Sequence, residues 1–141
     1  AAGLGIKKIY LFNSQRVEKI YWSCQQLTEA ELRESCLLGL EQARDTRLPE
    51  IHLRRLFKPF VEDELPTLLK ERRALVAHPS AEMICPRGPS DLRTAIAVGP
   101  EGGFIPYEIE KLTAAGFTPV RTYERILKVE TALVSLVGRL T

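Results

Sequence analysis

The sequence feature that most constrains the fold of this chain is the glycine-rich segment 98–104, which reads Val-Gly-Pro-Glu-Gly-Gly-Phe. The residues before it, 94–98, are apolar and partly β-branched, which favours a buried parallel strand over a helix. After it, Pro106 suits a first helical turn, and apolar residues recur at helical spacing until Gly116. In α/β proteins, a strand, a glycine loop and a helix in this order present backbone N–H groups to a ligand. The pattern predicts a binding loop, with a plain turn as the alternative.

A second unusual segment lies near the C-terminus, at residues 123–132. Charged and apolar residues alternate there without a clean period, so neither an amphipathic helix nor a half-buried strand explains residues 125–130. Segments that break such local rules are where functional residues are expected. This segment is therefore a second candidate for a functional loop.

Both segments match one known pattern. Residues 99–104 read Gly-Pro-Glu-Gly-Gly-Phe, and Glu108-Ile109 follow; later, residues 125–127 read Arg-Ile-Leu and residues 130–132 read Glu-Thr-Ala. These motifs resemble those of the ribosomal RNA small subunit methyltransferase E family, in the SPOUT class of knotted RNA methyltransferases. Upstream landmarks occur in the family's order at residues 4–6, 14–16, 41–42, 49–51 and 78–79. The resemblance covers nearly the whole chain.

The chain departs from the family pattern in both halves. The family's usual Leu-Gly before the arginine is Thr122-Tyr123 here, its following arginine is Lys128, and Val129 stands where threonine is frequent. A tyrosine in place of this glycine is expected to narrow the cofactor pocket. After Gln42 the family commonly has a small residue, a glycine and an arginine, whereas residues 43–47 read Ala-Arg-Asp-Thr-Arg. The register of these arginines, and hence their contact with RNA, stays open.

Alternating strand and helix patterns predict an α/β fold in which helices cover a parallel sheet. The helix expected at residues 28–43 begins with Thr28 and Glu31 in the spacing of a capping box. The resemblance adds a SPOUT-type architecture with a C-terminal trefoil knot, a feature that ordinary chains avoid. Strands are expected at residues 6–12, 51–53, 74–77, 94–98 and 119–123, and further helices at 61–71 (interrupted near Pro66), 107–115 and 130–140.

Length and composition fit one catalytic domain. With 141 residues, 45% of them hydrophobic, the chain can bury one ordinary core, so we expect a single domain over residues 1–141. The family's N-terminal β-barrel RNA-binding domain has no counterpart, and the chain opens without methionine, which indicates a fragment. Cys24, Cys36 and Cys85 have no metal-ligand spacing and cannot all pair, which indicates a reducing, cytoplasmic location without a metal site. No signal peptide or apolar run near the ~18 residues of a membrane span is present, so no membrane partner is expected.

The charge balance is mildly basic, with a formal net charge of +2. Basic residues gather at 44–58 and again at 70–73, which is compatible with neutralising phosphates. The alternative is a solvated face, because acidic residues occur beside them at 62–64 and at 71.

The resemblance implies methyl transfer from S-adenosyl-L-methionine (AdoMet) to N3 of a uridine in 16S ribosomal RNA, carried out by a homodimer whose partner is ribosomal RNA or the small ribosomal subunit. Arg125 is the candidate for stabilising a uridine anion, because its guanidinium stays charged. Glu130 is the candidate base or orienter, with a carboxylate that simply favours a helix N-terminus as the alternative. The candidate cofactor-binding residues are Ala77, His78, Gly99, Glu101, Gly102, Gly103, Tyr123, Ile126 and Leu127, and the candidate RNA-binding residues are Arg16, Arg44, Arg47 and Lys128.

Two rival functions remain at this stage. A relative that keeps the fold and the dimer but binds RNA without transferring methyl is motivated by Tyr123, Lys128 and the altered arginine register. A nucleotide-binding domain is the weaker rival, because no Lys-Ser or Lys-Thr follows Gly103 and no Gly-x-Gly-x-x-Gly occurs.

Overall fold

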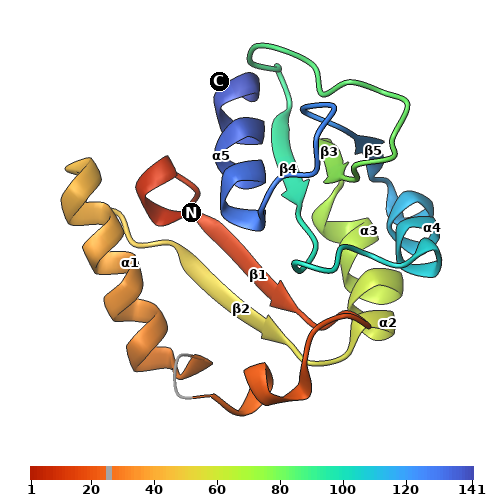
Figure 1. Cartoon of the computed structure of the whole chain (residues 1–141). Helices are drawn as coiled ribbons and strands as arrows, with labels where there is room; N and C mark the ends of the chain where they lie inside the picture. Colours follow the sequence, from red (N-terminus) through yellow and green to blue (C-terminus); the bar gives the residue numbers. More distant parts are fainter. Residues whose placement is uncertain (25–26) are drawn as a thin grey trace. The chain divides into compact units, whose positions relative to one another are not determined.

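A computed structural model describes residues 1–24 and 27–141 of the chain. The chain forms two compact units, each with its own parallel sheet (Figure 1). Unit 1 comprises Ala1–Asn13 and Val17–Arg55, and unit 2 comprises Ser14–Arg16 and Leu56–Thr141. The expected organisation as a single domain stays a prediction.

Unit 1 is built on two parallel strands, β1 (Lys8–Phe12) and β2 (Glu50–Arg54). The helix α1 (Glu29–Ala43) connects them, as parallel neighbours require, and short 3-10 turns lie at Ala2–Leu4 (η1) and Lys19–Ser23 (η2). Figure 1 shows α1 running alongside the two strands. The small core of this unit joins η1, α1 and β2 through Ala2, Cys36, Leu40, Leu48 and Ile51.

The ends of α1 follow from its sequence. At its N-terminus the Thr28 hydroxyl accepts a hydrogen bond from the Glu31 N–H at 3.4 Å, as the capping pattern predicts. At its C-terminus Arg44 adopts a left-handed conformation with φ of 54°, and the next N–H, of Asp45, donates to the Leu40 carbonyl at 3.0 Å. Both bonds satisfy helix-end groups that would otherwise lack partners. The predicted helix is confirmed with its bounds.

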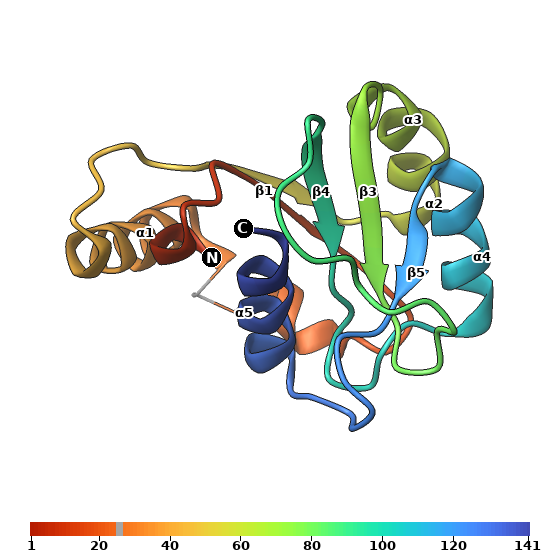
Figure 2. The same ribbon diagram turned by 90° about the horizontal axis from the view of Figure 1, so that it is seen from above.

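Unit 2 contains a three-stranded parallel sheet in the order β4-β3-β5. Figures 1 and 2 show α5 on one side of this sheet and α4 with α3 on the other. The side that faces α5 is held by a core of Leu75, Cys85, Val120, Leu136 and Leu140. The elements are α2 (Phe57–Pro59), the π-helical turn η4 (Phe60–Glu64), α3 (Leu65–Leu68), β3 (Arg72–Ala77), β4 (Arg93–Ala97), α4 (Pro106–Ala115), β5 (Thr118–Val120) and α5 (Val129–Leu140).

The predicted α/β class with parallel sheets and covering helices is confirmed. Because β3, β4 and β5 run in parallel, their carboxyl ends lie at the same edge of the sheet. The trefoil knot stays a prediction. No helix in residues 1–24 or 27–141 is long and apolar enough to cross a membrane.

Two predicted elements were wrong in extent. The helix expected at 61–71 begins at Phe57 and ends at Leu68, because a π-helical turn buries Phe60 and Val61 before Pro66 starts the next helical turn. Glu71 then adopts a φ of 55°, which a continuing helix excludes. The other error concerns β5.

The strand expected at 119–123 ends at Val120. Its partner β3 ends at Ala77, and the last bond of the ladder runs from the His78 N–H to the Val120 carbonyl at 3.0 Å. Arg121 instead pairs with the loop before β4: its N–H donates to the Met83 carbonyl, and its carbonyl accepts from the Cys85 N–H. The chain therefore leaves the sheet just before the unusual segment near the C-terminus.

Candidate functional site

A cavity of about 310 Å³ opens at the carboxyl ends of the strands in unit 2. This is where open α/β sheets usually bind ligands, and the volume lies in the usual range for small molecules. Its walls come from the chain after β3, the glycine loop after β4 and the segment between β5 and α5, with Arg16 completing them. Its lining includes Arg16, Ala77, His78, Ser80, Gly99, Glu101, Gly102, Gly103, Phe104, Arg121, Thr122, Tyr123, Arg125, Ile126 and Leu127.

The glycine loop needs two of its glycines for different reasons. At Gly99 a Cβ atom would lie 3.1 Å from the backbone nitrogen of Phe104 and from its ring, which is 6% exposed and unable to retreat. At Gly103 the φ of 70° is left-handed, and the N–H donates to the Pro100 carbonyl at 2.7 Å. The loop therefore folds tightly and presents backbone rather than side chains to the cavity.

The segment Ser14–Arg16, which is far from the glycine loop in sequence, contacts this loop and the helix that follows it. The carboxylate of Glu108, which is 3% exposed in the first turn of α4, accepts hydrogen bonds from two backbone groups. The Ile105 N–H donates to Oε2 at 2.9 Å and the Gln15 N–H donates to Oε1 at 2.6 Å. The next residue, Arg16, donates through Nη1 to the Gly102 carbonyl. The segment Ser14–Arg16 is thus bonded to α4 through the Gln15 main chain and to the glycine loop through the Arg16 side chain.

The wall between β5 and α5 is irregular and exposed. Ile126 is 81% exposed although it lines the cavity, and Arg125 beside it is also exposed. Regular secondary structure resumes at Val129, where α5 begins. In the first turn of this helix the Ala132 N–H donates to the Lys128 carbonyl at 2.8 Å. The lack of a regular pattern predicted for residues 125–130 holds for residues 125–128, whereas Val129 and Glu130 belong to α5.

The structure brings most of the candidate site residues to one place. All nine candidate cofactor-binding residues line the cavity, together with Arg125 and Arg16. Glu130 lies exposed in the first turn of α5, outside the lining, where its carboxylate complements the helix N-terminus. Lys128 precedes that helix, also outside the lining. Their proposed roles in catalysis and binding stay predictions.

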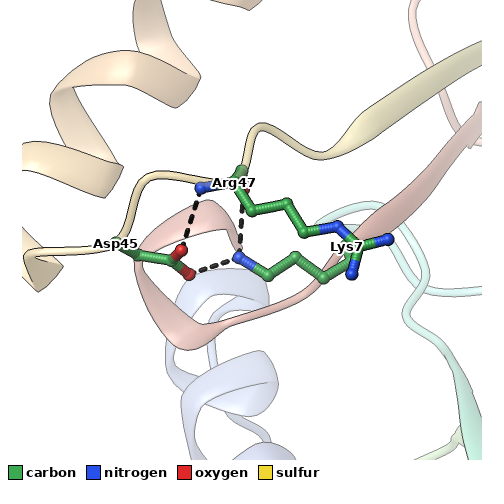
Figure 3. Close-up of polar contacts among 3 residues, drawn as sticks. All are labelled: Lys7, Asp45 and Arg47. Atoms are coloured by element: carbon green, nitrogen blue, oxygen red, sulfur yellow. Dashed lines mark hydrogen bonds and ion pairs between the residues drawn. The ribbon is translucent and has the colours of Figure 1, made fainter.

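Arg44 and Arg47 lie in unit 1, in the loop between α1 and β2, and both are exposed. Figure 3 shows how this loop is held: Lys7 Nζ contacts the Asp45 carboxylate and donates to the Arg47 carbonyl at 3.0 Å. The other Asp45 oxygen accepts from the Arg47 N–H at 3.0 Å. The hydrogen bond from Lys7 holds the pKa of Asp45 below its ordinary value, and the bond from Arg47 adds to this.

Arg44 has a left-handed conformation directly after α1, a position that glycine commonly favours. The carboxylate of the next residue, Asp45, organises the loop. The register of these arginines against the family pattern stays open.

The charged groups around the cavity are mostly basic. Arg16, Arg121 and Arg125 line it, against one carboxylate, that of Glu101. Guanidinium groups in such an arrangement favour an anionic partner such as a phosphate. Among residues 1–24 and 27–141, no group of three or more His, Cys, Asp or Glu side chains is placed to hold a metal ion.

Comparison with known proteins agrees with this geometry. A model of the RNA methyltransferase domain matches residues 1–141. The chain belongs to this family. The ribosomal RNA small subunit methyltransferase E of Mesomycoplasma hyopneumoniae (strain 232) is 27% identical over 141 residues, which are 99% of this chain and 60% of that protein. The protein of the same name from Buchnera aphidicola subsp. Schizaphis graminum is 30% identical over 124 residues, 87% of this chain and 45% of that protein.

Solved structures support the RNA methyltransferase fold. A ribosomal RNA small subunit methyltransferase E from Neisseria gonorrhoeae, bound to S-adenosyl methionine, superimposes with a TM-score of 0.78 at 24% identity, covering 97% of this chain and 55% of that one. A putative methyltransferase from Legionella pneumophila, in complex with the same cofactor, gives 0.65 at 25% identity with the same coverage. The predicted resemblance is confirmed, and the chain spans about half the length of the relatives it matches.

Two features of this RNA methyltransferase domain were missed in the sequence. Arg121 and Thr122 line the cavity, but they were not predicted to do so because a strand was expected to continue through residue 123. Glu108 was noted only as a landmark of the family. Its position three residues after the N-terminal cap of α4 was the available signal, because a carboxylate there reaches back to the cap N–H. Its bond to Gln15 had no signal in the sequence.

Proposed function

We propose that this chain is the catalytic part of an AdoMet-dependent ribosomal RNA methyltransferase that methylates N3 of a uridine in 16S ribosomal RNA. The observation that carries the proposal is the convergence of three separate stretches, residues 77–78, 99–103 and 123–127, on a single cavity. Cofactor-bound structures of similar proteins support the choice of cofactor.

The residues present fit such a cofactor. The tight loop at Gly99 and Gly103 allows a ligand to approach the backbone closely, and Ile126 and Leu127 offer apolar surface and backbone amides for an adenine. Ala77 and His78 form a third wall. When bound, AdoMet supplies a methyl group on a positively charged sulfur, toward which the Glu101 carboxylate is the available counter-charge.

Arg125 is the residue proposed to activate the methyl acceptor, N3 of a uridine. N3 of a uridine is protonated near neutral pH and becomes nucleophilic only when this proton leaves, so the site must stabilise the resulting anion or accept the proton. Arg125 offers a permanent positive charge and several donors at the cavity. We assign to Glu130 the role of base or orienter. Methyl transfer between a donor and an acceptor that are held in line needs no covalent intermediate with the enzyme.

Basic residues are the candidates for contact with RNA. We propose Arg16 at the cavity, Lys128 before α5, and Arg44 and Arg47 in the loop after α1 as contacts to ribosomal RNA or the small ribosomal subunit. We also propose that the protein acts in the cytoplasm as a homodimer that completes the site. The apolar surface of α5, where Val134 is 55% exposed, is the candidate interface.

Calorimetric titration of AdoMet and of its demethylated product into the chain tests the first part of the proposal. Saturable binding by a dimer, with the oligomeric state read by light scattering, is the expected result. A well-folded dimer that binds neither compound but binds ribosomal RNA would instead be a relative without methyl transfer.

Replacing Arg125 by alanine tests the assignment of the anion-stabilising group. Removing one such donor is expected to lower kcat for methyl transfer to small ribosomal subunits by about 100-fold or more, with the AdoMet Kd within about threefold of wild type. Arg87→Ala is the matched control, because Arg87 is exposed in the loop before β4 and lies outside the cavity lining. Turnover near the wild-type rate in Arg125→Ala would show that the role belongs to another group.

A further inference from the structure

Glu108 makes more contacts than a helix cap requires. A carboxylate three residues into a helix commonly accepts from the N–H at the helix start, and here Oε2 accepts from Ile105. The second oxygen, Oε1, accepts from the Gln15 N–H at 2.6 Å, across 93 positions of sequence. Glu108 is 3% exposed, so its carboxylate is largely shielded from water. Helix capping accounts for the bond from Ile105 but not for the bond from Gln15.

The residue after Gln15 is the arginine at the cavity. The Arg16 guanidinium donates to the Gly102 carbonyl, and its aliphatic part packs directly on the Gly102 backbone. A Cβ atom at Gly102 would lie 3.0 Å from Cδ of Arg16 and 3.2 Å from its Cβ. The missing side chain at Gly102 therefore leaves the space in which Arg16 lies. Its bond to Gly102 uses one of the five N–H groups of the guanidinium.

We propose that Glu108 is a positioning residue that acts through Arg16. The carboxylate bonds to the backbone beside Arg16 and to Ile105, the residue that directly follows the glycine loop. The guanidinium is therefore already oriented at the cavity when RNA arrives. This inference rests on the proposed function, since it takes RNA as the anionic partner of Arg16. An oriented arginine loses less conformational entropy when it binds a phosphate or a base than a free one does.

Replacing Glu108 by glutamine tests this inference. The side chain keeps its shape, but its NH₂ group cannot accept a hydrogen bond, so one of the two backbone N–H groups loses its partner. We expect the KM for RNA to rise about tenfold, with kcat at saturating RNA and the AdoMet Kd each within about threefold of wild type. Glu110→Gln, on the exposed side of the same helix, is the matched control. A loss confined to kcat would overturn the proposal.

A double-mutant cycle separates positioning from a merely structural effect. If Glu108 acts through Arg16, Glu108→Gln raises the KM for RNA in the wild-type background and leaves it unchanged in an Arg16→Ala background. Additive effects of the two substitutions would overturn the proposal. Gly102→Ala provides a route that leaves Glu108 intact: it displaces the Arg16 side chain and should raise the KM for RNA to a similar extent.

Amide hydrogen exchange tests the positioning without cofactor or RNA, so it separates failure of this inference from failure of the proposed function. The Gln15 amide should exchange about tenfold faster or more in Glu108→Ala, which removes both acceptor oxygens, than in wild type, and at the wild-type rate in Gly102→Ala. Unchanged exchange at Gln15 in Glu108→Ala would overturn the inference even if the wild-type chain methylates RNA. If the chain binds RNA without methylating it, the cycle is run on the RNA Kd instead.

Discussion

Two loops of this RNA methyltransferase domain are organised by a carboxylate, and they differ in how deeply that carboxylate is buried. Glu108 is 3% exposed and accepts hydrogen bonds from two backbone N–H groups. Asp45 has a side chain that is 30% exposed, and it combines the Arg47 N–H with the ammonium group of Lys7 (Figure 3). Removing the buried carboxylate is costly because it leaves buried N–H groups without an acceptor. The partly exposed carboxylate of Asp45 relies on an ion pair that water and salt weaken.

The loops also differ in which residue takes the left-handed turn. Gly103 supplies it in the glycine loop, where glycine has no steric penalty. Arg44 supplies it after α1 and bears the strain of a side chain in that region. The glycine loop is therefore built with little strain at this turn, and the loop after α1 accepts strain while displaying an exposed guanidinium.

The largest difference between the loops should appear on truncating the two carboxylates. Glu108→Ala leaves two backbone N–H groups without their acceptor and should lower the free energy of unfolding by about 2–4 kcal/mol. Asp45→Ala should have a much smaller effect, because both of its partners can turn to water. Urea unfolding followed by circular dichroism measures both. Equal losses would mean that burial does not distinguish the two carboxylates.

Substitutions at the two left-handed residues, Gly103 and Arg44, should change the stability of the chain in opposite directions. Gly103→Ala places a Cβ at a φ of 70° and should destabilise the chain by about 1 kcal/mol, although no atom lies within 4 Å of that Cβ. Arg44→Gly relieves the same kind of strain at a φ of 54° and should stabilise the chain by up to about 1 kcal/mol. Thermal unfolding of the two variants decides this, and shifts of the same sign would contradict the contrast.

The smallest effect concerns pH and salt. Because the folded pKa of Asp45 lies below its unfolded value, its contribution to stability is present above the unfolded pKa and is lost as the pH falls through the folded pKa. The difference in unfolding midpoint between wild type and Asp45→Asn should therefore shrink on acidification, and also at about 1 M NaCl. The difference between wild type and Glu108→Gln should persist in salt. An Asp45 effect that is insensitive to both would exclude the ion pair as its cause.

The sequence predicts those elements whose ends are determined by neighbouring residues. The capping of α1 by Thr28 and the stop at Gly116 are determined by neighbouring residues, and both were predicted. The end of β5 depends on where its partner β3 stops, and the π-helical turn at Phe60 depends on burial against other elements, so no local pattern shows them. Part of the cavity lining was predicted, and only through the family motif, because composition and periodicity carry no information on which distant loops meet.

The irregular wall of the cavity has a practical consequence. Arg125 and Lys128 lie in an exposed segment without regular structure, which is the kind of chain that proteases cut. Trypsin acting at these two positions would separate α5 from the rest of unit 2 and give fragments of defined mass. A molecule that fills the cavity is expected to cover Arg125, which lines it, and to slow cleavage there, while Lys128 lies outside the lining. Protection at Arg125 would then report occupancy of the cavity and allow cofactor analogues to be ranked on a gel without any RNA.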